Sequence, residues 1–168
     1  MNSRRASSVT KTKQALLVLV LAAAAQAGWA DTICRVTSNS GLAFGEYDTL
    51  SPTPRDSQAI VGVACDRNAG PQYVTIALGV GPGTYGSSVN ARKMRSASGE
   101  LLEYGLYRDA ARSSVWGFST GVDTGSQLLD VPNKGTQSAT FVLYARIPPL
   151  QDVSAGLYSD SVQITLTP

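Results

Sequence analysis

Histidine is absent from all 168 residues, and this absence excludes much of the chemistry that proteins commonly perform. Ser-His-Asp and Cys-His catalytic arrangements need an imidazole as general base, and most zinc sites use histidine or several thiolates. The chain offers only two cysteines as alternative soft ligands. We therefore expect no metal, no cofactor and no enzymatic activity.

Long apolar runs are also scarce, since the one extended segment, residues 15–25, is shorter than the roughly 20 residues that a membrane-spanning helix needs. Four basic residues precede it: Arg4, Arg5, Lys11 and Lys13. This arrangement is typical of a secretory signal peptide. Small residues at Ala25 and Ala27 predict removal of residues 1–27, with cleavage as late as Ala30 as the alternative. An N-terminal membrane anchor is the competing interpretation, and no later segment is expected to span a membrane.

An excess of basic charge is missing from the remainder of the chain. The full sequence has 14 basic and 12 acidic residues, and four of the basic ones lie in the predicted leader, which leaves a net charge of −2. Nucleic-acid binding needs a basic face on the folded domain, so we expect no nucleic-acid partner. Residues 28–168 show no internal repeat or linker and are predicted to form a single domain.

The two cysteines, Cys34 and Cys65, are predicted to form a disulfide, because the leader directs the chain to an oxidising compartment. A metal site at these residues is the alternative. It lacks partners, since there is neither a histidine nor a second cysteine pair.

Alternation of apolar and polar residues is the main periodic signal after the leader, and it predicts strands over residues 73–80, 141–147 and 161–167. Further strands are predicted over residues 42–47, 57–65, 92–96, 101–108 and 115–118. Turn-forming clusters lie between them at residues 51–54, 81–83, 98–99 and 133–135. Many short strands without a helical period indicate an all-β fold, an antiparallel β-sandwich.

Residues 103–117 form the most distinctive segment and are predicted to be a hairpin. Leu102, Tyr104 and Leu106 share one strand face, a polar turn covers residues 110–114, and residues 115–117 begin the return strand. Asp109 is expected to pair with Arg108 or Arg112 in this turn. The charged residues are thus interpreted as a strand-turn-strand element without catalytic function.

Three sequence features leave room for a chemical or ligand-binding function. Residues 123–126 (DTGS) are similar to the loop of aspartic proteases, but no apolar strand precedes them, so a turn is favoured. A pair of converging carboxylates, as in glycosidases, is the second alternative, but no spacing singles out a pair. Five aromatic residues are candidates for a sugar-binding platform: Tyr85, Tyr104, Tyr107, Trp116 and Tyr158.

Several motifs, in chain order, resemble one protein family. They are residues 34–36 (CRV), 42–47 (LAFGEY), 60–65 (IVGVAC), 104–109 (YGLYRD), 116–117 (WG), 144–148 (YARIP) and 156–166 (GLYSDSVQITL). Together they resemble the spore coat protein U-like domain, whose members include subunits of archaic (Csu-type) chaperone-usher pili. The motif residues to which the resemblance assigns a structural role are Phe44, Gly45, Tyr47, Tyr104, Tyr107, Arg108, Asp109, Trp116, Gly117, Arg146, Ile147, Pro148, Gly156, Tyr158 and Asp160.

The resemblance implies an immunoglobulin-like sandwich that lacks one strand, and an exported subunit of surface pili used in attachment and biofilm formation. Its implied partners are a periplasmic chaperone, an outer-membrane usher and other pilin subunits, which supply the missing strand by donor-strand complementation. The last strand, carrying Val162, Ile164 and Leu166, is expected to flank the open groove.

The chain departs from this family in its N-terminal extension. Cleavage after Ala27 leaves only residues 28–33 before the first cysteine, fewer than the roughly ten alternating residues that a donor strand needs. The chain is therefore expected to accept a strand without donating one. The alternative is a self-contained secreted β-sandwich that binds a glycan or another surface ligand.

Overall fold

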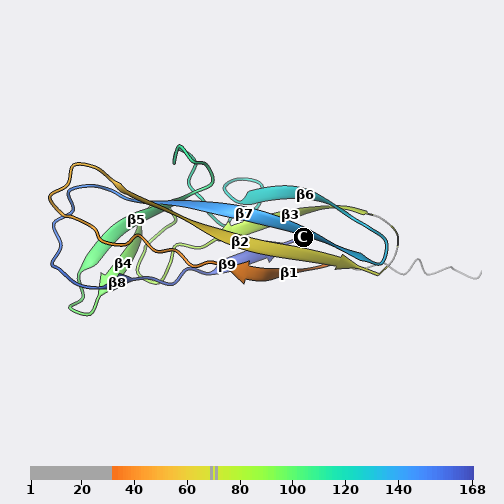
Figure 1. The fold of residues 1–168 in the computed structure, drawn as a ribbon, viewed down its shortest axis with the longest axis horizontal. Helices are drawn as coiled ribbons and strands as arrows, with labels where there is room; N and C mark the ends of the chain where they lie inside the picture. The colour runs from red at the N-terminus through yellow and green to blue at the C-terminus, as the bar shows by residue number, and fades with distance from the viewer. Residues whose placement is uncertain (1–31, 69, 71) are drawn as a thin grey trace, which may run out of the picture.

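The computed structural model describes residues 32–68, 70 and 72–168, and within them it contains strands and no helix. The strands are β1 (Thr32–Asn39), β2 (Arg55–Arg67), β3 (Gln72–Val80), β4 (Arg92–Ser96), β5 (Leu101–Tyr107), β6 (Gly125–Val131), β7 (Gly135–Ile147), β8 (Tyr158–Ser159) and β9 (Ile164–Thr167). They form an elongated antiparallel β-sandwich, as predicted (Figure 1).

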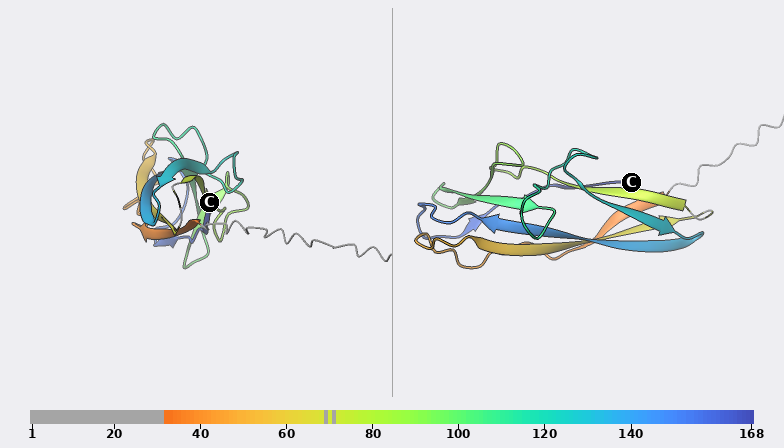
Figure 2. Two further views of the ribbon diagram at one scale, coloured as in Figure 1. Left: turned by 90° about the vertical axis from the view of Figure 1, so that its right-hand side faces the viewer. Right: turned by 90° about the horizontal axis from the view of Figure 1, so that it is seen from above.

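Two sheets make up the sandwich. The larger has the order β1-β2-β7-β5-β4-β8, and the smaller has the order β6-β3-β9. The longest pairing joins β2 to β7 from Arg55↔Ile147 to Arg67↔Gly135 and forms the spine of the larger sheet. Seen along the long axis, the strands of both sheets curl around a common centre (Figure 2, left).

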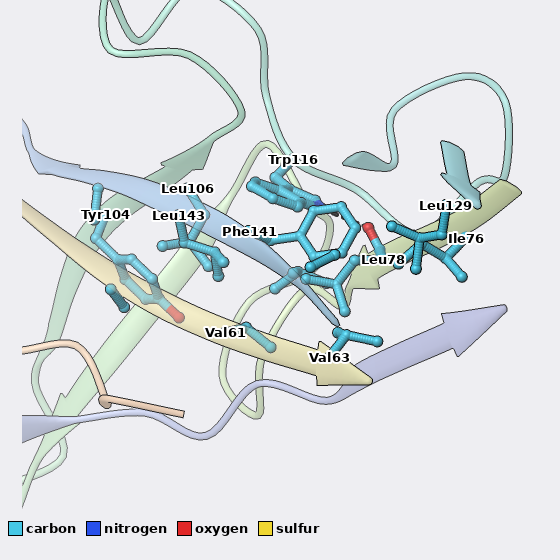
Figure 3. Close-up of a cluster of buried hydrophobic side chains, with 14 of the residues drawn as sticks. Val61, Val63, Ile76, Leu78, Tyr104, Leu106, Trp116, Leu129, Phe141 and Leu143 are labelled. Atoms are coloured by element: carbon cyan, nitrogen blue, oxygen red, sulfur yellow. Dashed lines mark hydrogen bonds between the residues drawn. The ribbon is translucent and has the colours of Figure 1, made fainter. Parts of the chain in front are cut away.

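The core lies between the sheets, where β5 and β7 turn one row of alternating residues inward, while β3 is buried on both faces over residues 76–80. In β5, Leu102, Tyr104 and Leu106 are buried while their neighbours face outward, as the alternation predicts. At the centre of the core the rings of Trp116 and Phe141 meet edge to face, 6.2 Å apart (Figure 3). The indole Nε1 of the 2% exposed Trp116 donates a hydrogen bond to the Leu78 carbonyl at 2.7 Å.

Most predicted strands are found, and β4 matches its predicted bounds of residues 92–96. The prediction for residues 42–47 is wrong, because this segment is irregular. The Ala43 carbonyl accepts a hydrogen bond from Ser57 Oγ, and the Phe44 carbonyl accepts one from Arg55 Nε. Side chains of β2 thus donate hydrogen bonds to backbone carbonyls that would pair with a neighbouring strand if residues 42–47 were themselves a strand.

Further differences concern the limits of predicted strands and strands that were not predicted. The last predicted strand, residues 161–167, is regular only over β9, and residues 115–118 contribute only an isolated bridge at Val115. Three strands, β1, β6 and β8, were not predicted. In β6 the outward-facing Leu128 is apolar and is followed by buried Leu129, so apolar and polar residues do not alternate along this strand.

The hairpin of residues 103–117 is present, since Tyr107 and Val115 form a bridge and Trp116 N–H donates to the Leu106 carbonyl at 2.8 Å. The expected pairing of Asp109 with an arginine is wrong. Its carboxylate accepts hydrogen bonds from the backbone of the turn instead, at 2.7 Å from the Ser114 N–H, and these hydrogen bonds lower its pKa.

The predicted disulfide between Cys34 and Cys65 is present. These residues face each other in the register of β1 and β2, so the bond fastens the edge strand β1 to the larger sheet. The predicted leader and its cleavage site lie outside the described residues. In the described ranges, no helix is long and apolar enough to cross a membrane.

Candidate functional site

One side of the sandwich brings together two edge strands that do not pair. β1 hydrogen-bonds to β2 and β9 hydrogen-bonds to β3, but β1 and β9 belong to different sheets. They lie in contact along the lower edge of the molecule in Figure 1. Each of the two strands therefore has one backbone edge that faces the other strand without a ladder of hydrogen bonds between them. Such unpaired edges can bind an additional strand.

The core is incompletely covered along this side. Within the described residues, the partly buried hydrophobic side chains packed against the core are Cys34, Leu42, Phe44, Tyr47, Val153, Tyr158, Val162, Ile164 and Leu166. All of them come from two stretches, residues 34–47 and 153–166, and residues of both stretches line one cavity. We call the region between residues 34–49 and 153–166 the terminal groove.

At one end the terminal groove widens into a cavity of about 930 Å³. Its walls are residues 42–49 and 153–158, and its floor includes Met94, Leu102 and Ile147. These three side chains belong to the buried core. The cavity therefore gives a ligand that enters the terminal groove direct access to core side chains.

Side-chain hydrogen bonds hold the two walls of this cavity together. The Tyr47 hydroxyl donates to the Pro148 carbonyl at 2.9 Å and accepts from the Gln151 N–H at 2.9 Å. The Gln151 amide also pairs with the Glu103 backbone, accepting from its N–H at 2.7 Å and donating to its carbonyl at 3.0 Å. Gln151 thus binds the β5 backbone at Glu103, outside the residues 105–107 that β5 pairs with β7.

Glu100 anchors the second wall farther along. Its carboxylate accepts hydrogen bonds from the Ser154 N–H, the Ser154 hydroxyl and the Tyr158 hydroxyl, each at 3.1 Å. The hydrogen bond from Ser154 is the main cause of a lowered pKa of Glu100. Burial, together with the bond to Glu100, raises the pKa of Tyr158. The carboxylate and the protonated phenol are therefore the paired forms at neutral pH.

Asp160 fixes the chain just before β9. It accepts hydrogen bonds from the Tyr104 hydroxyl at 2.6 Å and from the Thr84 N–H at 2.8 Å. Burial and the bond to Asp160 raise the pKa of Tyr104 well above its usual range. The Tyr104 ring in turn meets Phe44 edge to face at 6.1 Å, so this contact links the two borders of the terminal groove.

A buried arginine supports the strand that β9 pairs with. Arg92 is fully buried, and its guanidinium donates to the carbonyls of Val80, Gly81, Val89 and Trp116 at 2.6–2.9 Å. Burial lowers its pKa. Val80 is also the register partner of Ile164 in β9. The sequence prediction missed this role, although alternation in β4 puts Arg92 in the same inward row as Met94.

The family-motif residues lie in three places. Those lining the cavity are Phe44, Gly45, Tyr47, Ile147, Gly156 and Tyr158, and those tying its borders are Tyr104, Pro148 and Asp160. Those of the hairpin are Tyr107, Arg108, Asp109, Trp116 and Gly117. Arg146 lies apart, in a two-pronged ion pair with Asp56 at 2.7 and 2.8 Å. Val162, Ile164 and Leu166 are half-buried along the terminal groove.

The other chemical features predicted from the sequence are placed differently. Tyr104 and Trp116 are buried at 7% and 2% exposure, so they do not form a sugar-binding platform. The Asp123 carboxylate accepts the Ser119 N–H at 2.7 Å within its own loop, as a turn would require. In the part of the chain that the structure describes, no cluster of three Cys, Asp or Glu side chains is arranged to hold a metal ion.

Comparisons with known proteins agree on the type of domain. The family model of the Spore Coat Protein U domain matches residues 18–165. The chain is 29% identical over 143 residues to Protein U of Myxococcus xanthus, covering 80% of this chain and 76% of that protein.

A solved structure is also similar in fold. It is a chain from the CsuC-CsuE chaperone-tip adhesion subunit pre-assembly complex of the archaic chaperone-usher Csu pili of Acinetobacter baumannii. The TM-score is 0.52 at 22% identity, over 80% of this chain and 39% of that chain. The present chain therefore corresponds to well under half of the length of that structure.

Proposed function

This chain belongs to the Spore Coat Protein U domain family, and from this membership we propose that it is a structural, non-catalytic subunit of a chaperone-usher pilus. In this role the terminal groove accepts a β-strand from a partner protein. The observation that carries the proposal is the row of partly buried core residues along residues 34–47 and 153–166. An inserted strand would bury this row and pair with the free edges of β1 and β9.

Three partners follow from the proposal. A periplasmic chaperone lends a strand first, an outer-membrane usher receives the complex, and another pilin subunit then replaces the chaperone's strand. Support comes from the fold, which is similar to a chain of a chaperone–subunit complex. The chain is accordingly proposed to be exported by its leader, residues 1–27, and to serve surface attachment and biofilm formation from the pilus.

We also propose that the chain accepts a strand without donating one. Cleavage after Ala27 leaves residues 28–33 before Cys34, and β1 already uses Thr32 and Ile33 in its pairing with Arg67 and Asp66. The four remaining residues, 28–31, are shorter than a typical strand of about five or six residues. A role at the end of the fibre suits such a subunit.

Peptide complementation tests the proposed function. The mature chain, residues 28–168, is mixed with a synthetic peptide of about twelve residues that alternates Ile or Val with Thr, since twelve residues exceed a typical strand. We expect the peptide to raise the midpoint of thermal unfolding and to form a complex that survives gel filtration. A scrambled peptide of the same composition, without alternation, is the matched control.

A pair of variants distinguishes insertion of the peptide into the terminal groove from its non-specific binding elsewhere on the protein. Leu166→Asp places a charge on the half-buried row of β9 and should abolish the peptide's effect, whereas Thr165→Asp changes the exposed neighbour and should preserve it. A stable monomer whose unfolding midpoint is the same with and without the alternating peptide would refute the strand-accepting role. The self-contained sandwich would then be the better interpretation.

A further inference from the structure

The smaller sheet ends in β6, whose second backbone edge has no neighbouring strand within the described residues. Its ladder is with β3, from Gln72↔Val131 to Leu78↔Gly125, and β9 lies on the other side of β3. A cleft of about 370 Å³ lies between β6 and β7 and leaves space beside this edge. β6 therefore borders the molecule on the side away from β9 and the terminal groove (Figure 1).

The facing edge of β7 is partly covered by a side chain. β7 pairs with β5 only over residues 144–146, so at Thr140 the edge away from β2 has no partner strand. Gln127 Nε2 donates to the Thr140 carbonyl at 2.7 Å and takes the place of such a partner. Among the described residues, no side chain is hydrogen-bonded to the backbone of β6. An added strand therefore finds free backbone donors and acceptors on β6.

β6 lacks the features by which edge strands usually avoid pairing. Such strands are very short, carry lysine or proline, or contain a bulge. β6 has seven residues, neither lysine nor proline, and a register with β3 that runs without a shift. By contrast, the register of β1 shifts between Val36 and Ser38, and β8 has only two residues. β6 is therefore an edge that can pair with a further strand.

The outward face of β6 adds exposed apolar surface to this edge. Leu128 is 66% exposed, and Tyr73 of β3 is 69% exposed. Leu128 faces Thr75 in the register, so Tyr73 is its diagonal neighbour on the same face, about 7–8 Å away. A strand that pairs with β6 would place its own side chains against Leu128 and remove apolar surface from water.

The sequence of β6 is complementary to a second copy of itself. When all seven residues pair antiparallel with another β6, Leu128 is central and lies opposite the partner's Leu128. Ser126 then lies opposite the partner's Asp130, so a hydroxyl faces a carboxylate on each side of the centre. The two Asp130 carboxylates are separated by about 13 Å along the strands. A shift by one residue would set outward residues against inward ones, which disfavours other registers.

We propose that β6 is a self-association edge, at which two copies of this chain pair antiparallel about a two-fold axis through Leu128. The two smaller sheets then join in the order β9-β3-β6-β6-β3-β9. Both β9 strands lie at the outer ends of this sheet, so both terminal grooves stay free to accept a strand. In a pilus the contact joins subunits of neighbouring fibres side by side, and this consequence alone rests on the proposed function.

Sedimentation velocity of the mature chain at increasing concentration tests the pairing. We expect a monomer–dimer equilibrium, since a two-fold contact closes at two copies. Leu128→Lys should raise the dissociation constant about tenfold or more, because two lysines would face each other at the axis. Leu150→Lys is the matched control, an equally exposed leucine (62%) in the loop after β7, and should change nothing. A chain that stays monomeric at every concentration would overturn the proposal, as would a dimer that Leu128→Lys leaves intact.

The alternating peptide separates this edge from the terminal groove. Dimers should persist when the peptide is bound, and dimers that dissociate would place the contact in the groove and contradict pairing at β6. If the peptide does not bind, the two lysine variants still decide, so failure of strand insertion is seen separately.

Ser126→Lys tests the register and keeps the test decisive if Leu128→Lys does not fold. A lysine at this position faces the partner's Asp130, so the dimer should be at least as stable as that of the natural chain at low salt, where charge pairs are least screened. A weaker dimer would contradict the register.

Discussion

Arg92→Met is expected to destabilise the domain strongly, because it removes the donor shared by four backbone carbonyls. The substitution keeps a long, unbranched side chain, so the loss is chiefly that of the guanidinium. Each carbonyl left without a partner in a buried site costs about 1–3 kcal/mol. The gain from no longer burying a charge offsets several kcal/mol of this sum.

The net effect is about 3 kcal/mol, and for a domain of this size it corresponds to a fall of about 10 °C in the unfolding midpoint. Thermal unfolding followed by circular dichroism measures it. Lys93→Met is the matched control, since the adjacent lysine of β4 is partly exposed and its ammonium pairs with Glu103 at 3.2 Å. An exposed pair of this kind contributes at most about 1 kcal/mol.

The reasoning also predicts the outcome of Arg92→Lys. Lysine retains the charge but presents one compact ammonium in place of a planar fork, so it cannot reach carbonyls on β3, the 81–89 loop and Trp116 together. Most of the loss should remain. If Arg92→Met and Lys93→Met unfold within about 2 °C of each other, a difference below 1 kcal/mol, the four hydrogen bonds do not stabilise the fold as argued.

Three further predictions concern other contacts. Hydrogen bonding from Arg146 lowers the pKa of Asp56. The stabilisation of the fold by the Asp56 carboxylate is therefore present above pH about 4 and is lost as the pH falls through the folded pKa. The difference in unfolding free energy between Asp56→Asn and the natural chain should shrink when it is measured in acid. Reduction of the Cys34–Cys65 disulfide, which spans 31 residues, should lower the unfolding free energy by about 3–4 kcal/mol in urea titrations, and a dithiothreitol-insensitive midpoint would contradict this. Trp116→Phe should cost about 2–3 kcal/mol in the same assay through the lost indole hydrogen bond and ring volume, and an unchanged midpoint would count against it.

Sequence periodicity predicts the strands whose two faces differ clearly in environment. β4 and the alternating part of β7 were found because their inward rows belong to one continuous core. The disulfide was also predictable, because the two cysteines of a chain with a predicted leader have only each other as partners. The resemblance of ordered motifs identified the family and the sandwich.

Periodicity fails where the partner of a residue is distant in sequence and is not a strand. Residues 42–47 alternate like a strand, yet their carbonyls are bound by side chains of β2, more than ten residues away. The cavity depends on Tyr47 reaching Pro148 across 101 residues. Thr124 was identified only as part of a turn, since nothing local shows that its hydroxyl is buried without a partner.

The borders of the terminal groove are fastened independently of any strand that fills it. The disulfide holds β1 to β2, Asp160 holds the approach to β9, and Arg92 holds the end of β3 against which β9 pairs. A preformed groove requires ordering mainly of the incoming strand, which favours binding over a groove that must first open. Loss of any one of these contacts should therefore weaken strand binding more than the loss of global stability alone explains, because the two borders would no longer be held in place.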